Sequence, residues 1–341
     1  MFIIRADGNA KIGAGHLMRC LAIAEAVRKL PDGPEILVLC AEEDSAKLAS
    51  DKGFRTGVFY TDYQRMEEEI SLWPQWITDE ENTILVDSYH VTDEYLKGLQ
   101  SFGRVCLVDD MQNHVHPVDV VINYNVFADR AVYQRLYGGQ VQFYLGGAYA
   151  PLREQFQNVN YSVREQVEQV LITTGAGDAD NIAGDILDQI YREDLIYHVL
   201  VGRFSPHLAG WQKRAEECTN IQVHFDVQDM AGLMEKCDLA ITAGGSTVYE
   251  LAAVGVPFIV FSYAENQELL VEYLGANDVA GSAGAWHKNM DETKTCVRNW
   301  FHKLCEDFEL RKQYSGRERK LVDGLGAGRL ARILGTEESN I

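Results

Sequence analysis

The sequence has no surplus of positive charge. It carries 31 Lys and Arg residues against 51 Asp and Glu residues, which gives a formal net charge of -20 at pH 7. A broad surface for nucleic acid or anionic lipid is therefore not expected, because either partner would be repelled at long range. An anionic ligand must instead be bound locally. Backbone N–H groups at helix starts can bind a diphosphate without a basic surface.

Paired cysteine motifs and long apolar runs are also missing. The seven cysteines are odd in number, widely scattered and contain no CxxC pair. This pattern is typical of reduced thiols and favours a cytoplasmic protein. The N-terminus reads as a short strand entering a turn, without the basic segment and apolar core of a signal peptide. No apolar run reaches the roughly 18 residues that suggest a membrane-spanning helix. We therefore expect a cytoplasmic protein with no membrane partner.

What the chain does have is the composition and rhythm of two α/β domains. Its 341 residues exceed one typical domain, and 46% of them are hydrophobic, enough for substantial cores. Short β-type runs alternate with helical stretches, which predicts parallel, doubly wound sheets. The expected strands lie near residues 1–6, 35–41, 83–87, 104–108 and 119–123, and again near 167–173, 195–201, 221–225, 238–242 and 257–262.

The alternation is interrupted around residues 146–154. We therefore expect two Rossmann-like domains, 1–150 and 151–341, facing a central cleft. Residues 290–334 read as helical throughout, and the final helix is a candidate to cross back to the first domain. Because open α/β sheets bind ligands at the carboxyl ends of their strands, the loops after the strands are the places to look for chemistry.

The first candidate site is the loop 7–16, between the first strand and the first helix. Gly13 and Gly15 let the backbone turn sharply and approach a ligand, so we count Gly15 among the substrate-binding residues. His16 falls near the start of the helix, where the helix N-terminus disfavours an imidazolium and leaves a ring able to accept a proton from water. The plainer alternative is a simple turn with a capping histidine. The loop matches neither a dinucleotide fingerprint nor a Walker A sequence.

Two Gly-rich turns between strand and helix predict a diphosphate pocket in the second domain. One contains Gly175, and the other contains Gly245, Ser246 and Thr247. Backbone N–H groups at a helix start bind phosphate oxygens, and the two hydroxyls add further donors. We therefore expect these four residues to contact the ligand.

Polar side chains near these turns could bind the rest of a nucleotide sugar. Glu250 lies one helical turn after Ser246 and could reach a ribose whose diphosphate lies at the helix tip. Alternatively, it is an ordinary first-turn glutamate favoured by the helix dipole. Asn266 and Gln267 follow the apolar run 257–262, where they either meet the substrate or cap the next helix.

The remaining histidines form no cluster at a recognised metal-ligand spacing. His114 and His116 are separated by one residue, and we interpret them as a loop pair rather than a metal site. No DxD-type or His-rich set lies near either glycine turn. We therefore expect no metal and no cofactor.

Two segments resemble known families. The segment 242–267 contains Gly-Gly-Ser-Thr-x-x-Glu-Leu-Ala-x-x-Gly-Val-Pro and resembles the UDP-sugar half of GT-B enzymes related to the MurG glycosyltransferase. The segment 5–20, with Arg-Ala-Asp-Gly and Gly-x-Gly-His-x-x-Arg-Cys, more particularly resembles the UDP-2,4-diacetamido-2,4,6-trideoxy-β-L-altropyranose hydrolases of pseudaminic acid biosynthesis. Three further segments agree with it: 86–89, 149–156 and 323–327. The resemblance spans nearly the whole chain and implies a GT-B-like fold.

The resemblance also assigns roles to individual residues. It implies that His16 is the catalytic base and that Tyr89 lines the sugar site. It further implies that Glu250 holds the ribose and that Asn266 lies close to the sugar and phosphates. One departure is visible, because Ala176 stands where a second glycine is usual in the first phosphate turn. The turn at Ser246 is therefore the better candidate for the phosphate contact.

The expected reaction is hydrolysis of a UDP-linked diacetamido-trideoxy sugar to UDP and free sugar. Water deprotonated by His16 would attack the anomeric carbon with inversion, while the helix beginning near Ser246 stabilises the charge on UDP. The alternatives are a MurG-like glycosyltransferase, a 2-epimerase of the same architecture and a UDP-sugar-binding protein without turnover. In each case the expected partner is a UDP-sugar, with no nucleic acid and no membrane.

Overall fold

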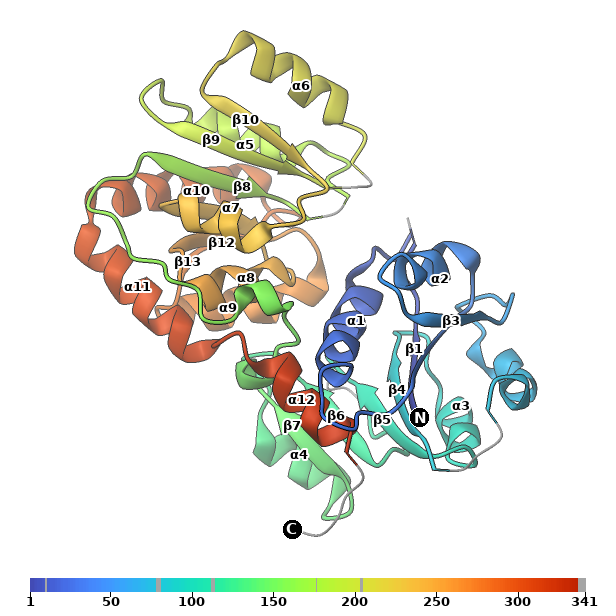
Figure 1. Ribbon diagram of the computed structural model, residues 1–341. Coiled ribbons are helices and arrows are strands. Elements are labelled where there is room, and N and C mark those ends of the chain that lie inside the picture. The colour runs from blue at the N-terminus through green and yellow to red at the C-terminus, as the bar shows by residue number, and fades with distance from the viewer. Residues whose placement is uncertain (10, 78–80, 112–113, 176, 203–204, 337–341) are drawn as a thin grey trace. The chain divides into compact units, whose positions relative to one another are not determined.

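The chain folds into two compact units, each built on one parallel sheet (Figure 1). The structure, a computed structural model, describes residues 1–9, 11–77, 81–111, 114–175, 177–202 and 205–336. Unit 1 comprises Met1–Glu154 with Leu325–Ile341, and unit 2 comprises Gln155–Gly324. The predicted fold class, α/β with two Rossmann-like halves, is confirmed.

Unit 1 contains a seven-stranded sheet in the order β3-β2-β1-β4-β5-β6-β7. Its strands are β1 (Phe2–Ala6), β2 (Ile36–Cys40), β3 (Arg55–Val58), β4 (Thr83–Asp87), β5 (Arg104–Val108), β6 (Val120–Asn123) and β7 (Gln142–Leu145). The inner strands are almost wholly buried, as expected for continuous apolar runs in a parallel sheet covered on both faces. β4 pairs directly with β1, so the loops after these two strands emerge side by side.

Helices cover the unit 1 sheet and several carry clear start signals. They are α1 (Gly15–Val27), α2 (Glu43–Ser50), α3 (Asp93–Leu99), α4 (Arg130–Tyr137) and α12 (Gly326–Leu334), with 3-10 segments η1 (Met66–Gln75), η2 (Gly147–Tyr149) and η3 (Glu154–Phe156), the last crossing into unit 2. Thr92 caps α3 and Asp129 caps α4 through their side chains, which satisfies backbone donors at the helix start. On α1, Leu17, Leu21 and Ala24 follow one another at spacings of four and three residues, and all three are fully buried.

Unit 2 contains a six-stranded parallel sheet in the order β10-β9-β8-β11-β12-β13. Its strands are β8 (Gln169–Thr173), β9 (Ile196–Val201), β10 (Ile221–Phe225), β11 (Leu239–Ala243), β12 (Phe258–Ser262) and β13 (Gly281–Ala285). Its helices are α5 (Ile182–Ile190), α6 (Leu208–Glu217), α7 (Met230–Lys236), α8 (Thr247–Val254), α9 (Glu268–Ala276), α10 (Met290–Glu306) and α11 (Phe308–Leu321), with the 3-10 turn η4 (Glu265–Gln267). β8 and β12 flank β11, which brings three strand-to-helix turns to one edge.

The C-terminal helix packs in unit 1 rather than unit 2. α12 lies beside α1 (Figure 1). At its first residue, a Cβ on Gly326 would lie 2.2 Å from the carbonyl oxygen of Ala150, so only glycine fits this close approach. The predicted second domain, 151–341, therefore differs from unit 2 in two places: residues 151–154 and the segment from Leu325 onward, which carries α12, belong to unit 1. Among the described residues, no helix is both long and apolar enough to cross a membrane.

Candidate functional site

The loop before His16 is held tightly against unit 1. Gly8 approaches α1 so closely that a Cβ would lie 3.2 Å from the Cα of Ala14. The Ser45 hydroxyl accepts a hydrogen bond from the Gly8 N–H at 3.0 Å and donates one to the Gly8 carbonyl at 3.1 Å. Gly13 has a φ of +74°, a conformation that favours glycine. These contacts fix the backbone that presents His16, the second residue of α1.

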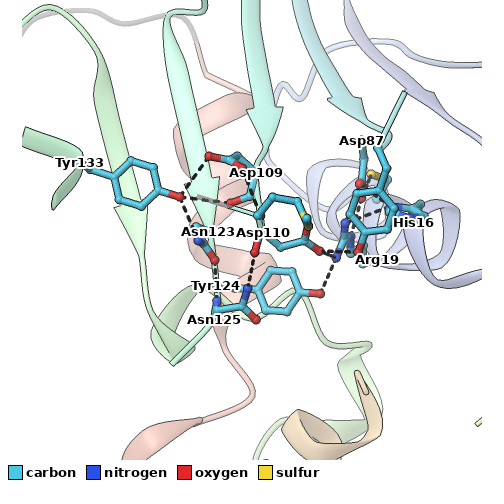
Figure 2. A network of polar contacts seen from close by, with 12 residues as sticks. His16, Arg19, Asp87, Asp109, Asp110, Asn123, Tyr124, Asn125 and Tyr133 are labelled. Carbon is cyan, nitrogen blue, oxygen red and sulfur yellow. Dashed lines mark hydrogen bonds and ion pairs between the residues drawn. The ribbon is translucent and has the colours of Figure 1, made fainter. Parts of the chain in front are cut away.

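His16 forms a hydrogen-bonded pair with Asp87 (Figure 2). Asp87 is the last residue of β4 and is paired with Ala6, the last residue of β1, so its carboxylate lies next to the loop after β1. The His16 Nδ1 lies 2.7 Å from the Asp87 Oδ1, and His16 is only 8% exposed. A carboxylate can only accept, so Nδ1 carries a proton, and in the neutral ring the lone pair is then on Nε2. The ring is thereby oriented as a base at Nε2.

Arg19 binds the same carboxylate from one helical turn further along α1. Its Nη2 donates to Asp87 Oδ1 at 2.6 Å and its Nε donates to Oδ2 at 2.5 Å, a bidentate contact. Nη2 also lies 3.0 Å from the His16 Nδ1. A guanidinium cannot accept a proton, so Arg19 and His16 share the Asp87 oxygen instead of bonding to each other.

Asp87 is ionised despite its burial. Burial alone would raise the pKa of the carboxyl, but the charges and hydrogen bonds of Arg19 and His16 outweigh it and hold the Asp87 pKa well below its usual range. A permanent carboxylate beside an imidazole stabilises the imidazolium that forms when the ring takes a proton. The three side chains therefore constitute an oriented acid–base group.

The network continues to residues that follow the next strands. Arg19 Nη1 donates to Asp110 Oδ2 at 2.9 Å and to the Tyr124 hydroxyl at 2.6 Å. The Tyr89 hydroxyl donates to Asp110 Oδ2 at 3.2 Å, and its ring meets the His16 ring edge-on, with centroids 4.5 Å apart. Tyr89 is 51% exposed. Tyr89 therefore contacts the His16 ring while about half of its own surface stays open to solvent, and its place in a sugar site stays a prediction.

A second layer of polar contacts supports this group (Figure 2). The Tyr133 hydroxyl lies 2.9 Å from Asn123 Nδ2 and 3.1 Å from Asp109 Oδ2. Asn125 donates to the Asp110 carbonyl at 3.2 Å. The carboxyl ends of β4, β5 and β6 are therefore tied into one continuous network.

Four residues of this network were not predicted from the sequence: Arg19, Asp87, Asp110 and Tyr124. Arg19 and Asp87 lie in the segments 5–20 and 86–89, which resemble the hydrolase family, but neither residue was assigned a role. A usable signal was present, since a polar residue ends or follows each of three neighbouring buried strands. What the sequence could not supply was the pairing of β4 with β1.

In unit 2, the glycine turns predicted to bind phosphate come together at one edge of the sheet. Gly175, after β8, has a φ of +94°, and a Cβ there would lie 3.6 Å from the Tyr263 hydroxyl after β12. The turn after β11 lies between these two, because β11 pairs with both strands. Ala176, the departure noted in the first turn, lies outside the described residues.

The turn after β11 leads directly into α8. α8 begins at Thr247 after the N-cap residue Ser246 and, among the described residues, no side chain caps it. A Cβ on Gly245 would meet no atom within 4 Å, so space is open beside the helix start. Glu250 lies half-buried in the first turn. The helix N-terminus, the hydroxyls and this carboxylate are thus grouped as the sequence predicted, and ligand contact by these residues stays a prediction.

Asn266 and Gln267 differ in their surroundings. The Gln267 side chain is buried, and its Oε1 accepts a hydrogen bond from the Tyr263 N–H at 3.1 Å. This contact closes the turn after β12 and gives Gln267 a structural role. Asn266 is exposed on the same turn. Of the expected site residues, unit 1 holds Gly15, His16 and Tyr89, and unit 2 holds Gly175, Gly245, Ser246, Thr247, Glu250, Asn266 and Gln267.

Comparison with known proteins identifies the fold as GT-B. Residues 145–280 match the glycosyltransferase family 28 C-terminal domain. The structure of MurG from Acinetobacter baumannii superposes with a TM-score of 0.64 at 14% identity, covering 98% of each chain. A putative UDP-N-acetylglucosamine 2-epimerase from Listeria monocytogenes superposes with a TM-score of 0.63 at 13% identity, covering 98% of this chain and 97% of that one. These likenesses show the fold.

Particular relatives narrow the resemblance further. The chain is 24% identical over 343 residues to the spore coat polysaccharide biosynthesis protein SpsG of Bacillus subtilis, covering 97% of this chain and 96% of the relative. It is also 24% identical over 275 residues to the UDP-2,4-diacetamido-2,4,6-trideoxy-beta-L-altropyranose hydrolase of Campylobacter jejuni, covering 80% of this chain and 95% of the relative. The resemblance drawn from the sequence is therefore confirmed.

Proposed function

We propose that this chain hydrolyses UDP-2,4-diacetamido-2,4,6-trideoxy-β-L-altropyranose to UDP and the free sugar, as a step of pseudaminic acid biosynthesis. The observation that carries the proposal is the His16 ring held by Asp87, with Arg19 binding the same carboxylate. The hydrolase name of the Campylobacter jejuni relative supports the choice of substrate and reaction.

In the proposed reaction, His16 acts as a general base. Its Nε2 takes a proton from water, the water oxygen bonds to the anomeric carbon, and the bond from that carbon to the UDP oxygen breaks. The sugar leaves with inverted configuration. Asp87 stabilises the imidazolium as it forms, and Arg19 keeps Asp87 ionised and in place. The Tyr89 ring packs edge-on against the His16 ring, and Tyr89 lines the sugar site.

UDP is bound by the residues grouped at the edge of the unit 2 sheet. The N-terminus of α8, with the hydroxyls of Ser246 and Thr247, stabilises the negative charge that develops on the leaving diphosphate. Gly175 and Gly245 allow the backbone to approach the phosphates. Glu250 accepts hydrogen bonds from the ribose hydroxyls, and Asn266 lies close to the sugar and phosphates.

Isotope labelling tests the proposal directly. The protein is incubated with the UDP-sugar in ¹⁸O-labelled water, and the products are analysed by mass spectrometry and by NMR of the first-formed anomer. We expect UDP release, with the label on the sugar and inversion at the anomeric carbon. Label on UDP would mean attack at phosphorus, and transfer to an added acceptor in place of hydrolysis would favour the glycosyltransferase alternative. Tight binding without UDP release would favour a binding protein.

A further inference from the structure

A second cluster of ligating side chains lies in unit 1 and shares no residue with the His16 network. Asp93 is the first residue of α3, and His114 and His116 lie in the connection between β5 and β6. The His114 Nε2 lies 3.1 Å from both Asp93 oxygens, and the His116 Nδ1 lies 3.5 Å from Asp93 Oδ1. One ligand atom from each of the three residues lies within 4.8 Å of the other two.

These separations match a small metal ion. In a tetrahedral zinc site with bonds of about 2.0–2.1 Å, neighbouring ligand atoms are about 3.3–3.4 Å apart. The two separations between imidazole nitrogen and carboxylate oxygen, 3.1 and 3.5 Å, lie on either side of that value. The His114 side chain is 55% exposed, so a small rotation can bring its nitrogen closer to that of His116.

The His116 ring also has an unused nitrogen. Its side chain is only 12% exposed, and within the described part of the chain its Nδ1 makes no hydrogen bond, although Asp93 Oδ1 lies 3.5 Å away. A buried polar atom without a partner is uncommon and calls for an explanation, such as an ion. The Nδ1 lies beside Asp93 and the His114 ring, whose centroid is 4.9 Å from that of His116. A metal ion among the three side chains would supply the missing partner.

The backbone that carries the two histidines is held in place by Tyr137. Its hydroxyl accepts a hydrogen bond from the His116 N–H at 3.0 Å and donates one to the His114 carbonyl at 3.4 Å. The Tyr137 ring stacks on Tyr133, at 6.1 Å and 23°. The histidines are therefore presented by a supported segment, which lowers the cost of ordering them around an ion.

We propose that Asp93, His114 and His116 bind a zinc ion, with water completing the tetrahedron, and that the ion joins α3 to the connection between β5 and β6. Imidazole nitrogen and carboxylate oxygen are ligands that zinc accepts. The sequence indicated only a loop pair because it shows two ligands at short spacing. Asp93, 21 residues before His114, supplies the third ligand through the fold. The site is independent of the proposed hydrolysis.

Metal titration of the full-length, tag-free protein tests the site. After EDTA treatment and buffer exchange, Co²⁺ is added and followed by visible absorption, and Zn²⁺ is followed by calorimetry. We expect one saturable equivalent with the ligand-field bands of tetrahedral Co²⁺ and a higher melting temperature with Zn²⁺. His114→Ala, His116→Ala and Asp93→Asn should each weaken Zn²⁺ affinity by at least about 10-fold, and Tyr137→Phe by about 10-fold.

The control is His302→Ala, which removes an exposed histidine from α10 in unit 2 and should leave Zn²⁺ affinity unchanged. Circular dichroism of each variant establishes that it is folded. His114→Ala is the variant least able to disturb folding, because the His114 side chain is exposed. The proposal is overturned if Co²⁺ gives no saturable ligand-field spectrum. It is equally overturned if folded His114→Ala and Asp93→Asn bind Zn²⁺ as tightly as His302→Ala does.

Discussion

At the scale of single residues, two neighbours act on the His16 imidazole in different ways. Asp87 sets which nitrogen carries the proton, and Tyr89 meets the ring edge-on. Arg19 Nη2 lies 3.0 Å from the His16 Nδ1, but when that nitrogen donates its proton to Asp87 it has no lone pair to accept from Arg19, so Arg19 acts through the carboxylate it holds. Removing His16 should therefore remove the proposed chemistry, whereas changing Asp87 should impair the orientation and charge stabilisation of the base.

We expect His16→Asn to lower kcat by about 10²–10⁴-fold, the usual contribution of a general base. UDP affinity should stay close to wild type, because the lost interaction belongs to the transition state. Asp87→Asn should also lower kcat, and it should leave UDP affinity unchanged. Steady-state kinetics and calorimetry with UDP make the measurement. A His16→Asn protein that keeps most of its kcat would exclude the mechanism.

Glu250 gives the complementary expectation for ground-state binding. Glu250→Ala should weaken UDP binding by about 1–3 kcal/mol, because hydrogen bonds to a charged group are lost. Calorimetry with UDP measures the change, and Glu309→Ala, on exposed α11 surface, serves as the control. If folded Glu250→Ala binds UDP as tightly as wild type, the ribose assignment is wrong.

At the scale of secondary-structure elements, α11 contains a carboxyl group that opposes folding at neutral pH. α11 packs on α8, and Glu318 on it is fully buried. Burial raises the Glu318 pKa well above its usual range, although the Phe258 N–H and the Arg319 charge act in the opposite direction. Between the unfolded pKa, about 4.3, and the higher folded value, the folded state holds more protons. The Glu318 carboxyl therefore lowers the free energy of unfolding as pH rises through this range, and it has no such cost at lower pH, where it is protonated in both states.

Glu318→Gln should consequently gain stability over wild type as pH rises. We expect the difference in free energy of unfolding, variant minus wild type, to increase by more than about 1 kcal/mol between about pH 5 and pH 8. Urea denaturation at the two pH values measures it. Glu309→Gln, on the exposed face of the same helix, should show no such change. A difference independent of pH would mean that Glu318 ionises as readily in the folded state as in the unfolded state.

The same scale shows what the sequence could and could not predict. The predicted strands correspond to β1, β2, β4, β5 and β6 in unit 1 and to β8 through β12 in unit 2. All of them except β10 are apolar runs that are largely buried, as in a parallel sheet covered on both faces, whereas β10 buries only Ile221. β3, β7 and β13 were not predicted. β13, Gly-Ser-Ala-Gly-Ala, has almost no apolar surface and is a strand only because it pairs with β12.

The site shows the same division between local and non-local information. His16 was predicted because the glycines and the helix start are adjacent to it in sequence. Its partner Asp87 lies 71 residues away and becomes a neighbour through the pairing of β4 with β1. Asp93 meets His114 and His116 in a similar non-local way. Short-range patterns located the loops, and sheet order decided which side chains meet.

At the scale of the whole molecule, the net charge of -20 sets a condition on how an anionic nucleotide approaches. A charge of that sign repels UDP at long range, whereas the proposed contacts at the start of α8 act only over the first turn of the helix. Long-range repulsion is screened by salt, with a Debye length of about 30 Å at 0.01 M and about 8 Å at 0.15 M. Salt should therefore affect the encounter and the bound state differently.

We expect the association rate constant for UDP to rise as ionic strength increases from about 0.01 M to about 0.15 M, because screening removes repulsion between like charges. The dissociation rate constant should rise less, since the contacts of the bound diphosphate lie at short range. Stopped-flow fluorescence with a fluorescent UDP analogue measures both constants, and a neutral uridine analogue, whose association should not depend on salt, is the control. An association rate that falls with salt would mean that a local positive potential around the glycine turns, rather than the net charge, governs the approach of the nucleotide.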